Sequence, residues 1–493
     1  MKNYDFYYLA KRNLLKDSID RSVLVGEKIK KEDRVHISAV CGKAMASIAC
    51  ILSQLGYKIT ASDDHFYPPM SDVLDSHNIK CLSSDIENLK DVDLIIPGNT
   101  LGPNHIEIIE AKKRNIPMIS GAEVLGSILT ENKRSLVVSG THGKTTTSSL
   151  LVSIFKSAKR DPSFMIGGVI KNIGSYSVGG QNSNFAIFEG DEYDCAFFDK
   201  APKFLRYRTT SAIITSIELD HIDLYPTFED YKQSFQFLIE DLQEGGFLVC
   251  HSSVLNMLDV SKCKANIFVY DRNSVGDCIY KIKNITECGT YFDFVFLDIC
   301  YTDFFVPLFG DYNIENSLSV IILSILEGLN IDEIKNGLEN FGGVAERQEF
   351  IGQKNGIYVF RDFAHHPTAL RLTIDGFEKR FPNKRIVPVF HPRSITSRRK
   401  IFEDQYVNCL SNCPLSFIIK SPFKEVDNRN DFIDVDSMVS KLNNLGLKSF
   451  SVDSPDSCVS TVINHLKTGD VVVFMSNSDL ANEPQNLLDQ ILK

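Results

Sequence analysis

Short apolar runs alternate with helical patterns along almost the whole chain, and this alternation restricts the possible folds more than any other feature. The runs are VHISAV, KITAS, DLIIPG, SLVVSG, FAIFEG, SAIITSI, FLVCHS, IYVFRDF, RIVPVF, LSFIIK and DVVVFM. Apolar strands separated by helices are typical of largely parallel sheets whose faces are covered by helices. The sequence therefore predicts an α/β protein.

The length of the chain predicts three domains of this type. Its 493 residues exceed what one hydrophobic core can organise, because a domain holds about 150 residues. The polar stretch TENKR precedes a strand near residue 132, and an FGG turn lies near residue 343, and both features are typical of boundaries. We expect domains at residues 34–132, 133–343 and 344–493, after a leading segment of residues 1–33.

Charge and hydropathy exclude several classes of partner. A net charge of -10 disfavours nonspecific binding to nucleic acid or anionic membrane, because a surface that follows phosphates needs excess positive charge. No apolar run approaches the roughly 18 residues of a membrane span, and charges interrupt the N-terminal apolar residues, unlike in a secretory signal. We expect a cytoplasmic protein with no nucleic-acid or membrane partner, whose twelve scattered cysteines are reduced thiols.

The first domain shows an incomplete mononucleotide-binding pattern. A strand around His36 leads into a tight turn through Cys41 and Gly42, then a helix, then a strand that ends at Asp63. An acidic residue about 20 positions after such a turn commonly meets a ribose hydroxyl, so Cys41, Gly42 and Asp63 are candidate binding residues. Non-glycine residues stand where glycines are expected, so the alternative is a structural βαβ unit with Asp63 as a loop or cap residue.

The strongest local signal is SLVVSGTHGKTTTSSLLVSIF, which predicts a strand, a short glycine loop and an amphipathic helix. Backbone N–H groups of such a loop and the positive end of the helix dipole bind phosphate oxygens. Lys144 would neutralise the β- and γ-phosphates, and Thr145 would offer its hydroxyl to Mg²⁺. The spacing is two residues shorter than the general Walker A pattern, and a chance match is the alternative. The candidate nucleotide-binding residues are Gly140, Thr141, His142, Gly143, Lys144, Thr145 and Thr146.

Acidic residues and one histidine follow two later strands. Glu189, Asp191 and Glu192 end the run FAIFEGDEYD, and Asp220, His221 and Asp223 end SAIITSIELDHID. Carboxyl ends of parallel strands converge on one crevice, and hard oxygen ligands suit Mg²⁺. Each group alone could be a solvated loop, but together, after a phosphate loop, they indicate a metal site. An imidazole is a less usual ligand of Mg²⁺, so the chemistry alone does not assign His221.

The motifs SGTHGKTTT, FEGDEYD, LDHID, GDYNIENSL, GVAERQE and DFAHHPTAL have the order and spacing of the Mur ligases, and the resemblance runs from about residue 34 to near the C-terminus. It implies a UDP-sugar domain with a Rossmann-like fold, a central ATPase domain with a phosphate loop and a C-terminal Rossmann-like domain that brings the amine. It therefore implies an ATP- and Mg²⁺-dependent amide ligase.

The resemblance also implies roles for individual residues. Lys144, Glu189 and His221 would be catalytic, with Thr145, Glu189 and His221 holding Mg²⁺. Asn313 and Asn316 would lie near the adenine, Arg347 at the phosphates and Asp362 at the ribose, while His365 and His366 would lie in the substrate cleft. Arg347 could alternatively be a surface residue. Tyr312 departs from the histidine usual in relatives, and Gln236 stands where many members carry a carbamylated lysine, an absence that fits the alanine-adding and tripeptide-using branches.

Two segments favour the tripeptide-using branch, the murein peptide ligases. DCAFFDKAPKFLRYR contains Lys200, and FHPRSITSRRK resembles the pattern E-P-R-S-N-T, with His391 and Ile395 as departures. Lys200, Arg393 and Arg398 are therefore candidate substrate-binding residues. Arginines could pair bidentately with the carboxylates of a peptide of L-alanine, γ-D-glutamate and meso-diaminopimelate. The alternative is a solvated basic loop.

The expected reaction joins the lactyl carboxylate of UDP-N-acetylmuramate to the amine of this tripeptide through an acyl phosphate, in peptidoglycan recycling. The alternatives are an alanine-adding UDP-N-acetylmuramate ligase, a folate-type polyglutamate ligase and a noncatalytic sensor of ATP or UDP-sugar. The presence of Lys144, Glu189 and His221 argues against the sensor. The oligomeric state is left open.

Overall fold

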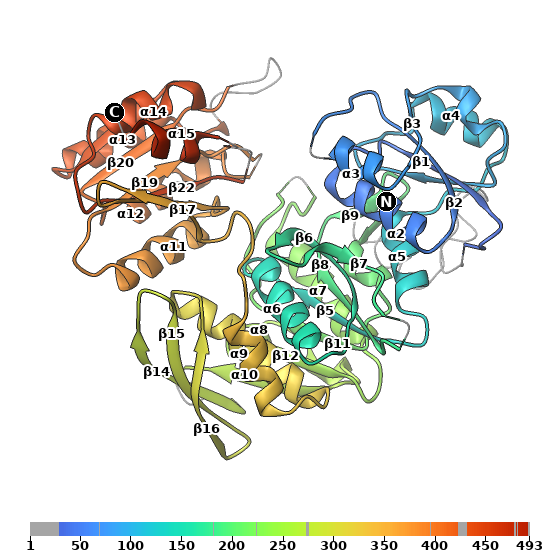
Figure 1. Cartoon of the computed structure of the whole chain (residues 1–493), viewed down its shortest axis with the longest axis horizontal. Coiled ribbons are helices and arrows are strands. Elements are labelled where there is room, and N and C mark those ends of the chain that lie inside the picture. Colours follow the sequence, from blue (N-terminus) through green and yellow to red (C-terminus); the bar gives the residue numbers. More distant parts are fainter. Residues whose placement is uncertain are drawn as a thin grey trace.

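The computed structural model of the chain describes residues 29–68, 70–180, 182–222, 224–272, 276–394, 396–422, 431–477, 480 and 482–491. Each apolar run noted in the sequence overlaps a strand, and each of these strands has a parallel neighbour. Figure 1 shows three α/β domains, with the first at upper right, the central one below and the C-terminal one at upper left. The predicted fold class is confirmed.

The first domain has a four-stranded parallel sheet in the order β3-β2-β1-β4. Its chain turns to opposite sides of β1 to form β2 and β4, and a ligand crevice forms at such a reversal of strand order, outside the carboxyl ends of the strands. Its elements are β1 (Arg34–Ser38), α2 (Lys43–Gln54), β2 (Lys58–Ser62), α3 (Met70–Ser76), β3 (Cys81–Leu82), η2 (Ile86–Leu89), β4 (Leu94–Pro97), α4 (Ile106–Lys113) and α5 (Gly121–Leu129).

A buried polar network lies inside this domain. The Glu107 carboxylate of α4 accepts hydrogen bonds from the hydroxyls of Ser38 at 2.5 Å and Ser62 at 2.7 Å, and from the Asn88 amide at 2.9 Å. His36 Nε2 lies 3.4 Å from the same carboxylate, and neither side chain is exposed. The network satisfies a buried charge that would otherwise be costly.

Acid should weaken this network. Burial would raise the pKa of Glu107, but hydrogen bonds from His36, Ser38 and Asn88 hold it at about 2. Because the folded pKa lies below the ordinary value of 4.5, its contribution to stability is present above that value and is lost as the pH falls toward 2. We expect the melting temperature of the wild type to fall more steeply from about pH 5 to about pH 3 than that of Glu107→Gln. Equal slopes in thermal scans would contradict this assignment.

The central domain is built on a ten-stranded sheet in the order β16-β15-β14-β13-β12-β11-β5-β8-β6-β7. The strands from β14 to β6 are parallel to their neighbours, and antiparallel strands extend both edges. A small antiparallel pair, β9 and β10, stands apart from this sheet. The elements are β5 (Arg134–Ser139), α6 (Lys144–Ser157), β6 (Ser163–Ile170), β7 (Gly174–Ser177), β8 (Phe185–Gly190), β9 (Asp194–Ala196), β10 (Asp199–Pro202), η3 (Lys203–Arg206), β11 (Ser211–Ile214), α7 (Phe228–Asp241), β12 (Phe247–His251), α8 (Ser252–Leu255), η4 (Val260–Lys262), β13 (Asn266–Asp271), β14 (Cys278–Ile285), β15 (Thr290–Phe296), β16 (Ile299–Val306), α9 (Asp311–Leu326) and α10 (Ile331–Glu339).

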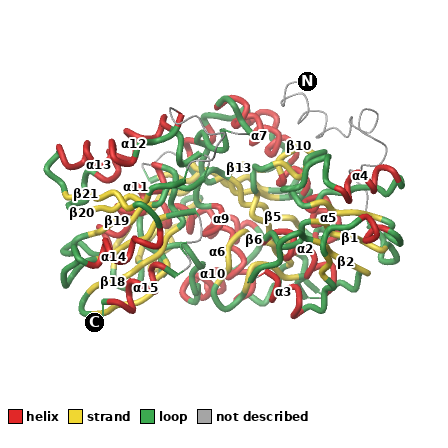
Figure 2. The backbone as a smooth tube through the Cα atoms, turned by 90° about the horizontal axis from the view of Figure 1, so that it is seen from above, coloured by secondary structure: helices red, strands yellow, loops and turns green. Residues whose placement is uncertain are grey.

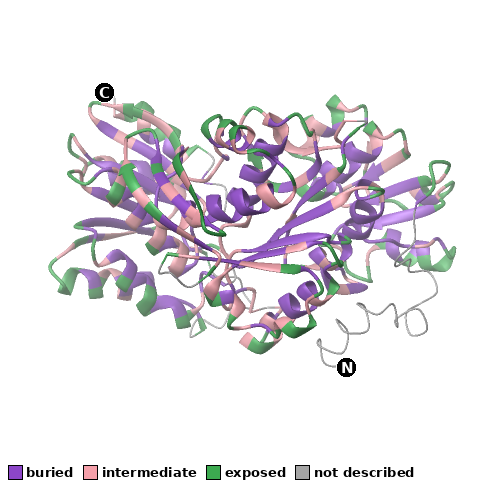
Figure 3. Ribbon diagram, turned by 90° about the horizontal axis from the view of Figure 1, so that it is seen from below, coloured by how far each residue is buried: buried purple, intermediate pink, exposed green. Residues whose placement is uncertain are grey.

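Helix α6, which follows the phosphate loop, is buried on all sides along residues 145–155. One side of α6 contacts the strands β5, β6 and β8. Helices α9 and α10 also contact α6, and they cover the face that an amphipathic helix would expose to solvent. The prediction of an amphipathic helix was therefore wrong. Gly337 lets α10 approach α6 closely, because a Cβ there would lie 2.5 Å from the Cα of Ile154. Figure 3 shows the buried strands and helices of this region in purple.

The C-terminal domain has a six-stranded sheet in the order β17-β18-β22-β19-β20-β21, in which only β17 is antiparallel to its neighbour. Viewed from above, the three domains lie in a row with the central domain in the middle (Figure 2). The elements are β17 (Glu349–Lys354), β18 (Ile357–Asp362), α11 (Pro367–Arg380), β19 (Ile386–Phe390), η5 (Lys400–Phe402), α12 (Glu403–Leu410), β20 (Leu415–Ile419), α13 (Val435–Asn444), β21 (Lys448–Val452), η7 (Pro455–Ser457), α14 (Cys458–Ile463), β22 (Val471–Met475) and α15 (Glu483–Gln490).

A buried ion-pair cluster joins the first and central domains. The Arg206 guanidinium of η3 donates to both carboxylate oxygens of Asp199, at 2.7 and 2.9 Å. Its Nε also lies 3.7 Å from the carboxylate of Glu123 in α5. All three side chains are at most 6% exposed, and the acidic partners raise the pKa of Arg206 although burial would lower it. The cluster therefore fixes α5 against η3 by charges that are largely shielded from water.

None of the helices in the described part of the chain is both long and apolar enough to cross a bilayer.

Candidate active site

The phosphate loop has the geometry that the sequence predicts. The loop between β5 and α6 contains Gly140 with φ of 128° and Gly143 with φ of 81°, both in the region that favours glycine. A Cβ on Gly140 would lie 2.2 Å from the hydroxyl of Thr215, so the loop passes too close to the end of β11 for any side chain there. Residues 141–146 line a cavity between the central and C-terminal domains, called here the phosphate-loop cavity.

Lys144 is held across the loop by an acidic residue. Its Nζ donates to the carbonyl oxygen of Gly140 at 2.6 Å and lies 2.9 Å from the Glu192 carboxylate. Burial would lower the pKa of Lys144, but the charge of Glu192 raises it overall. Glu192 is fully buried and also accepts from the Tyr231 hydroxyl at 3.2 Å. The sequence motifs singled out Lys144 but gave Glu192 no role beyond a strand-end acid.

The residues predicted to hold a metal ion also meet at the phosphate-loop cavity. The Thr145 hydroxyl donates to Glu189 at 2.7 Å, and the other Glu189 oxygen accepts from the N–H of Gly167 at 2.7 Å. His221, with φ of 53°, packs against Tyr193 with ring centroids 4.3 Å apart. A hydroxyl, a carboxylate and an imidazole that face one cavity are a donor set that fits a divalent cation. Asp223 lies outside the described residues.

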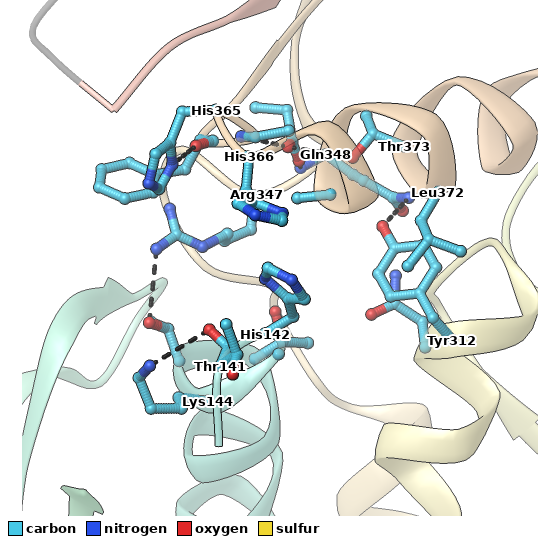
Figure 4. Close-up of a pocket in the computed structure, with 18 of the residues that line it drawn as sticks. Thr141, His142, Lys144, Tyr312, Arg347, Gln348, His365, His366, Leu372 and Thr373 are labelled. Carbon is cyan, nitrogen blue, oxygen red and sulfur yellow. Dashed lines mark hydrogen bonds between the residues drawn. The ribbon is translucent and has the colours of Figure 1, made fainter. Parts of the chain in front are cut away.

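The amide side chains expected at the adenine lie at the start of α9, and each donates one hydrogen bond within the protein. Asn313 lines the phosphate-loop cavity and donates to the carbonyl oxygen of Phe309 at 2.9 Å. Asn316 lies beneath Gly143, where a Cβ would meet its amide oxygen at 2.7 Å, so it packs directly against the loop. Tyr312 also lines the cavity, and its hydroxyl accepts from the Gln348 amide at 2.8 Å (Figure 4).

The C-terminal domain covers the phosphate loop from the opposite side. Arg347 donates to the Thr145 hydroxyl at 3.4 Å, and its guanidinium lies 4.0 Å from the ring of Phe363. Figure 4 shows it pointing from the C-terminal domain toward Lys144. The Asp362 carboxylate accepts the N–H groups of Gln348 at 2.7 Å and Ala364 at 2.8 Å, so it organises the loop that carries Arg347. His365 and His366 line the same cavity.

Glu218 joins the central and C-terminal domains beside the phosphate loop. Its carboxylate accepts from the Thr368 hydroxyl at 2.7 Å and lies 3.3 Å from His142 Nε2. His142, Glu218 and His366 have possible ligand atoms within 4.8 Å of one another. The Nδ1 atom of His366 accepts the N–H of Thr368, however, which leaves the proton on Nε2, where a metal would need a lone pair. His142 and Thr368 contact Glu218, whereas His366 Nε2 has no hydrogen-bond partner among the described residues. Glu218 was not predicted from the sequence, although it closely precedes the predicted Asp220 and His221 in the segment after β11.

Burial keeps His366 neutral. Burial, and to a smaller extent the neighbouring His142, lower the pKa of His366 to about 4. Burial would raise the pKa of Glu218, but hydrogen bonding and charge from His142 hold it at about 2. At neutral pH the junction therefore contains the Glu218 carboxylate and the neutral imidazole of His366.

A second cavity lies between the first and central domains at the reversal of strand order, and it is called here the switch-point cavity. Its lining includes Gly42, Asp63, Gly98 and Asn99 from the first domain and Met165, Cys195, Lys203 and Tyr207 from the central domain. Gly42 and Asp63 were predicted from the sequence. Cys41 is not in the lining, and its N–H donates to the Asp63 carboxylate at 2.8 Å, so it orients that carboxylate.

The basic residues predicted for substrate binding have separate environments. Lys200 pairs with Asp194 and lines neither cavity, whereas Lys203, three residues later, lines the switch-point cavity. Arg393 is exposed in the loop after β19. Arg398 is buried, donates to the carbonyl oxygen of Pro422 at 2.9 Å and lies over the Phe432 ring, so it supports that loop from within. Ile395 lies outside the described residues.

Models of three Mur ligase domains match consecutive parts of the chain. The model described as "Mur ligase family, catalytic domain" matches residues 34–133, "Mur ligase middle domain" matches residues 138–324, and "Mur ligase, glutamate ligase domain" matches residues 346–478. Their order along the chain is that of the three sheets described above.

Known proteins resemble the chain over almost its full length. It is 30% identical to the UDP-N-acetylmuramate--L-alanine ligase of Clostridium perfringens, over 91% of this chain and 96% of that protein. The structure of a UDP-N-acetylmuramate-alanine ligase from Thermotoga maritima shares the fold, with a TM-score of 0.76, 18% identity and coverage of 94% and 99%. That of a murein peptide ligase from Psychrobacter arcticus has a TM-score of 0.65, 27% identity and coverage of 93% and 98%. The resemblance predicted from the motifs is thus confirmed, and the chain belongs to the Mur ligase family of ATP-dependent carbon–nitrogen ligases.

Proposed function

We propose that this enzyme joins the lactyl carboxylate of UDP-N-acetylmuramate to the amine of L-alanyl-γ-D-glutamyl-meso-diaminopimelate, in the recycling of peptidoglycan. The observation that supports this substrate is the position of Arg393. In the C-terminal sheet Asp362, Met475 and Phe390 lie side by side at the ends of β18, β22 and β19. Arg393 follows Phe390 by three residues and is exposed. The positive charge of Arg393 therefore follows the carboxyl end of β19, and His365 and His366 follow the carboxyl end of β18 in the same sheet.

The phosphate-loop cavity suits ATP. Backbone N–H groups of residues 141–146 and the N-terminus of α6 would bind the phosphates, and Lys144 and Arg347 would approach them from opposite domains. Thr145, Glu189 and His221 would hold Mg²⁺, which when bound supplies positive charge to the phosphate oxygens. The switch-point cavity, with Gly42 and Asp63, would hold the UDP-sugar.

The reaction follows from these positions. A lactyl carboxylate oxygen attacks the γ-phosphorus, the bond to the β-phosphate oxygen breaks, and ADP leaves with that electron pair. Lys144 stabilises the charge that spreads over the transferring oxygens. The uncharged amine of the peptide then attacks the acyl carbon, the nitrogen loses a proton, and the tetrahedral intermediate expels inorganic phosphate. Holding both substrates beside the loop supplies much of the rate.

The tripeptide is favoured because it carries several carboxylates that an exposed guanidinium can bind bidentately. The similarity to a murein peptide ligase structure at 27% identity over 93% of this chain gives further support. A second candidate substrate is L-alanine, because the relative from Clostridium perfringens, 30% identical, is named for it. Alanine has one carboxylate and needs no extended basic loop.

A substrate panel tests this proposal. The purified enzyme is incubated with UDP-N-acetylmuramate, ATP and Mg²⁺, and the release of inorganic phosphate is measured with tripeptide, with L-alanine, with L-glutamate and without amine. We expect strong stimulation by tripeptide and identification of the ligated UDP-sugar by mass spectrometry. Stimulation by alanine but not tripeptide would establish the second candidate, and no stimulation by any amine would reject both.

Replacing Arg393 should affect the peptide and leave ATP unaffected. Loss of a bidentate, charge-assisted contact should lower kcat/KM for tripeptide by roughly tenfold to a hundredfold in Arg393→Ala, through a higher KM. Arg393→Lys should recover part of this, because an ammonium keeps the charge without the planar fork. The control is Arg371→Ala, which removes an exposed arginine of the same domain, paired with Asp375. Unchanged tripeptide kinetics, or a raised KM for ATP, would show that the loop does not bind the peptide.

A further inference from the structure

An ion pair connects the two cavities of this enzyme. Lys203 lines the switch-point cavity, and Asp191 lines the phosphate-loop cavity. Their side chains meet, with Lys203 Nζ 2.6 Å from Asp191 Oδ2. The pair therefore lies between the place proposed for the UDP-sugar and the place proposed for the transferring phosphate.

Lys203 is held in this position by the surrounding structure. It is the first residue of η3, and its backbone N–H donates to the carbonyl oxygen of Tyr193 at 3.1 Å. The same short helix ends at Arg206, whose buried contacts with Asp199 and Glu123 fix η3 against the first domain. Its ammonium lies 5.8 Å from the centroid of the Tyr193 ring, which itself packs on His221. Lys203 thus lies between two fixed features: the Tyr193 ring beside His221, and the junction of the first and central domains at Arg206.

The ammonium remains charged and keeps part of its hydrogen-bonding capacity. Burial would lower the pKa of Lys203, but the neighbouring Asp191 raises it overall. Protein encloses most of the Lys203 side chain, and 22% of it remains exposed. An ammonium has three N–H donors, and the contact with Asp191 uses one of them. The remaining donors can meet an anion that enters from the switch-point cavity.

The chemistry of the proposed reaction calls for such a group. A carboxylate must approach a triphosphate that is itself negative, and the two anions repel each other at close range. We propose that Lys203 binds the lactyl carboxylate of the UDP-sugar and directs it toward the phosphate loop, while Asp191 holds the ammonium in place. This inference rests on the proposed UDP-N-acetylmuramate substrate and assigns a residue to its reacting end. It replaces Lys200, which pairs with Asp194 outside both cavities, as the lysine of this segment that touches substrate.

The test compares two nucleotide sugars that differ in the reacting group. UDP-N-acetylmuramate carries the lactyl carboxylate, and UDP-N-acetylglucosamine has a hydroxyl in its place. Binding of each is measured by calorimetry with Mg²⁺ and a nonhydrolysable ATP analogue present. The wild type should prefer UDP-N-acetylmuramate, and Lys203→Met should lose roughly tenfold to a hundredfold of that affinity while UDP-N-acetylglucosamine binds as before. Lys203→Arg should keep part of the preference.

Controls separate this role from a structural one. Lys232→Met removes another partly buried lysine of the central domain, which is 28% exposed and paired with Glu229, and should keep the preference. The double variant Lys203→Met with Asp191→Asn leaves no unpaired charge and should lose the preference even if the single variant unfolds. A wild type that does not bind UDP-N-acetylmuramate would reject the proposed substrate. A wild type that prefers it, with the preference intact in the folded Lys203 variants or lost in Lys200→Met instead, would overturn only the assignment of Lys203.

Discussion

The variant Lys144→Ala should lose ligase activity by about 10² to 10⁴ in kcat, because a fixed positive charge beside the transferring phosphoryl group supplies several kcal/mol of transition-state stabilisation. Phosphate release with UDP-N-acetylmuramate, ATP, Mg²⁺ and tripeptide measures the effect. The control Lys156→Ala removes a lysine near the other end of the same helix, where it pairs with Asp161, and should keep wild-type turnover. Near-normal activity of Lys144→Ala would refute the phosphate-loop assignment.

The same substitution should also reduce stability. Lys144 neutralises the fully buried carboxylate of Glu192, and removing one partner of a buried pair leaves an uncompensated charge. The double variant Lys144→Ala with Glu192→Gln removes that charge and should recover much of the lost melting temperature but none of the activity. A double variant that regained turnover would mean that the first loss came from misfolding rather than from the missing ammonium.

The second large effect is expected for Glu189→Gln, which should lower kcat by about 10² to 10³ at a Mg²⁺ concentration that saturates the wild type. Glutamine keeps the shape of glutamate but loses the charge that a hard cation requires, and its single oxygen cannot accept from both Thr145 and Gly167 as the carboxylate does. The Mg²⁺ concentration for half-maximal activity should therefore rise.

A titration of activity against Mg²⁺ distinguishes this role from general damage to the site. The control Glu339→Gln changes an exposed glutamate at the end of α10 and should leave the titration unchanged. If Glu189→Gln were slow but had the wild-type Mg²⁺ dependence, Glu189 would support the loop without binding the metal ion.

Most of the parallel strands and the phosphate loop could be predicted because each depends on residues adjacent in sequence. A buried parallel strand is a continuous apolar run, and the loop needs glycines at fixed positions. The antiparallel strands β14, β15 and β16 were missed because their pattern alternates. Phe292, Phe294 and Phe296 are buried, and the residues between them are more exposed. No continuous apolar run therefore marks this edge of the central sheet.

The polar partners of the site were harder to predict, because they depend on contacts between distant segments. Glu218 stands out only when Thr368, 150 residues later, lies beside it. Lys200 and Lys203 belong to one basic segment, and the turn from β10 into η3 determines which of them faces a cavity. Arg393 and Arg398 belong to a second basic segment, in which Arg393 is exposed and Arg398 is buried against Phe432. Composition and spacing do not distinguish the members of such pairs.

The cluster of Glu123, Asp199 and Arg206 has a consequence for how relatives of this enzyme can vary and recombine. Losing one member of a buried ionic group costs about 3 to 5 kcal/mol, whereas replacing the whole group by apolar residues of similar size can be neutral. These three positions should therefore change together during evolution, as a charged set or as an apolar set. A chimaera joined near residue 132 would take Glu123 from one parent and its partners from the other. Only parents that match at all three positions should give a folded hybrid.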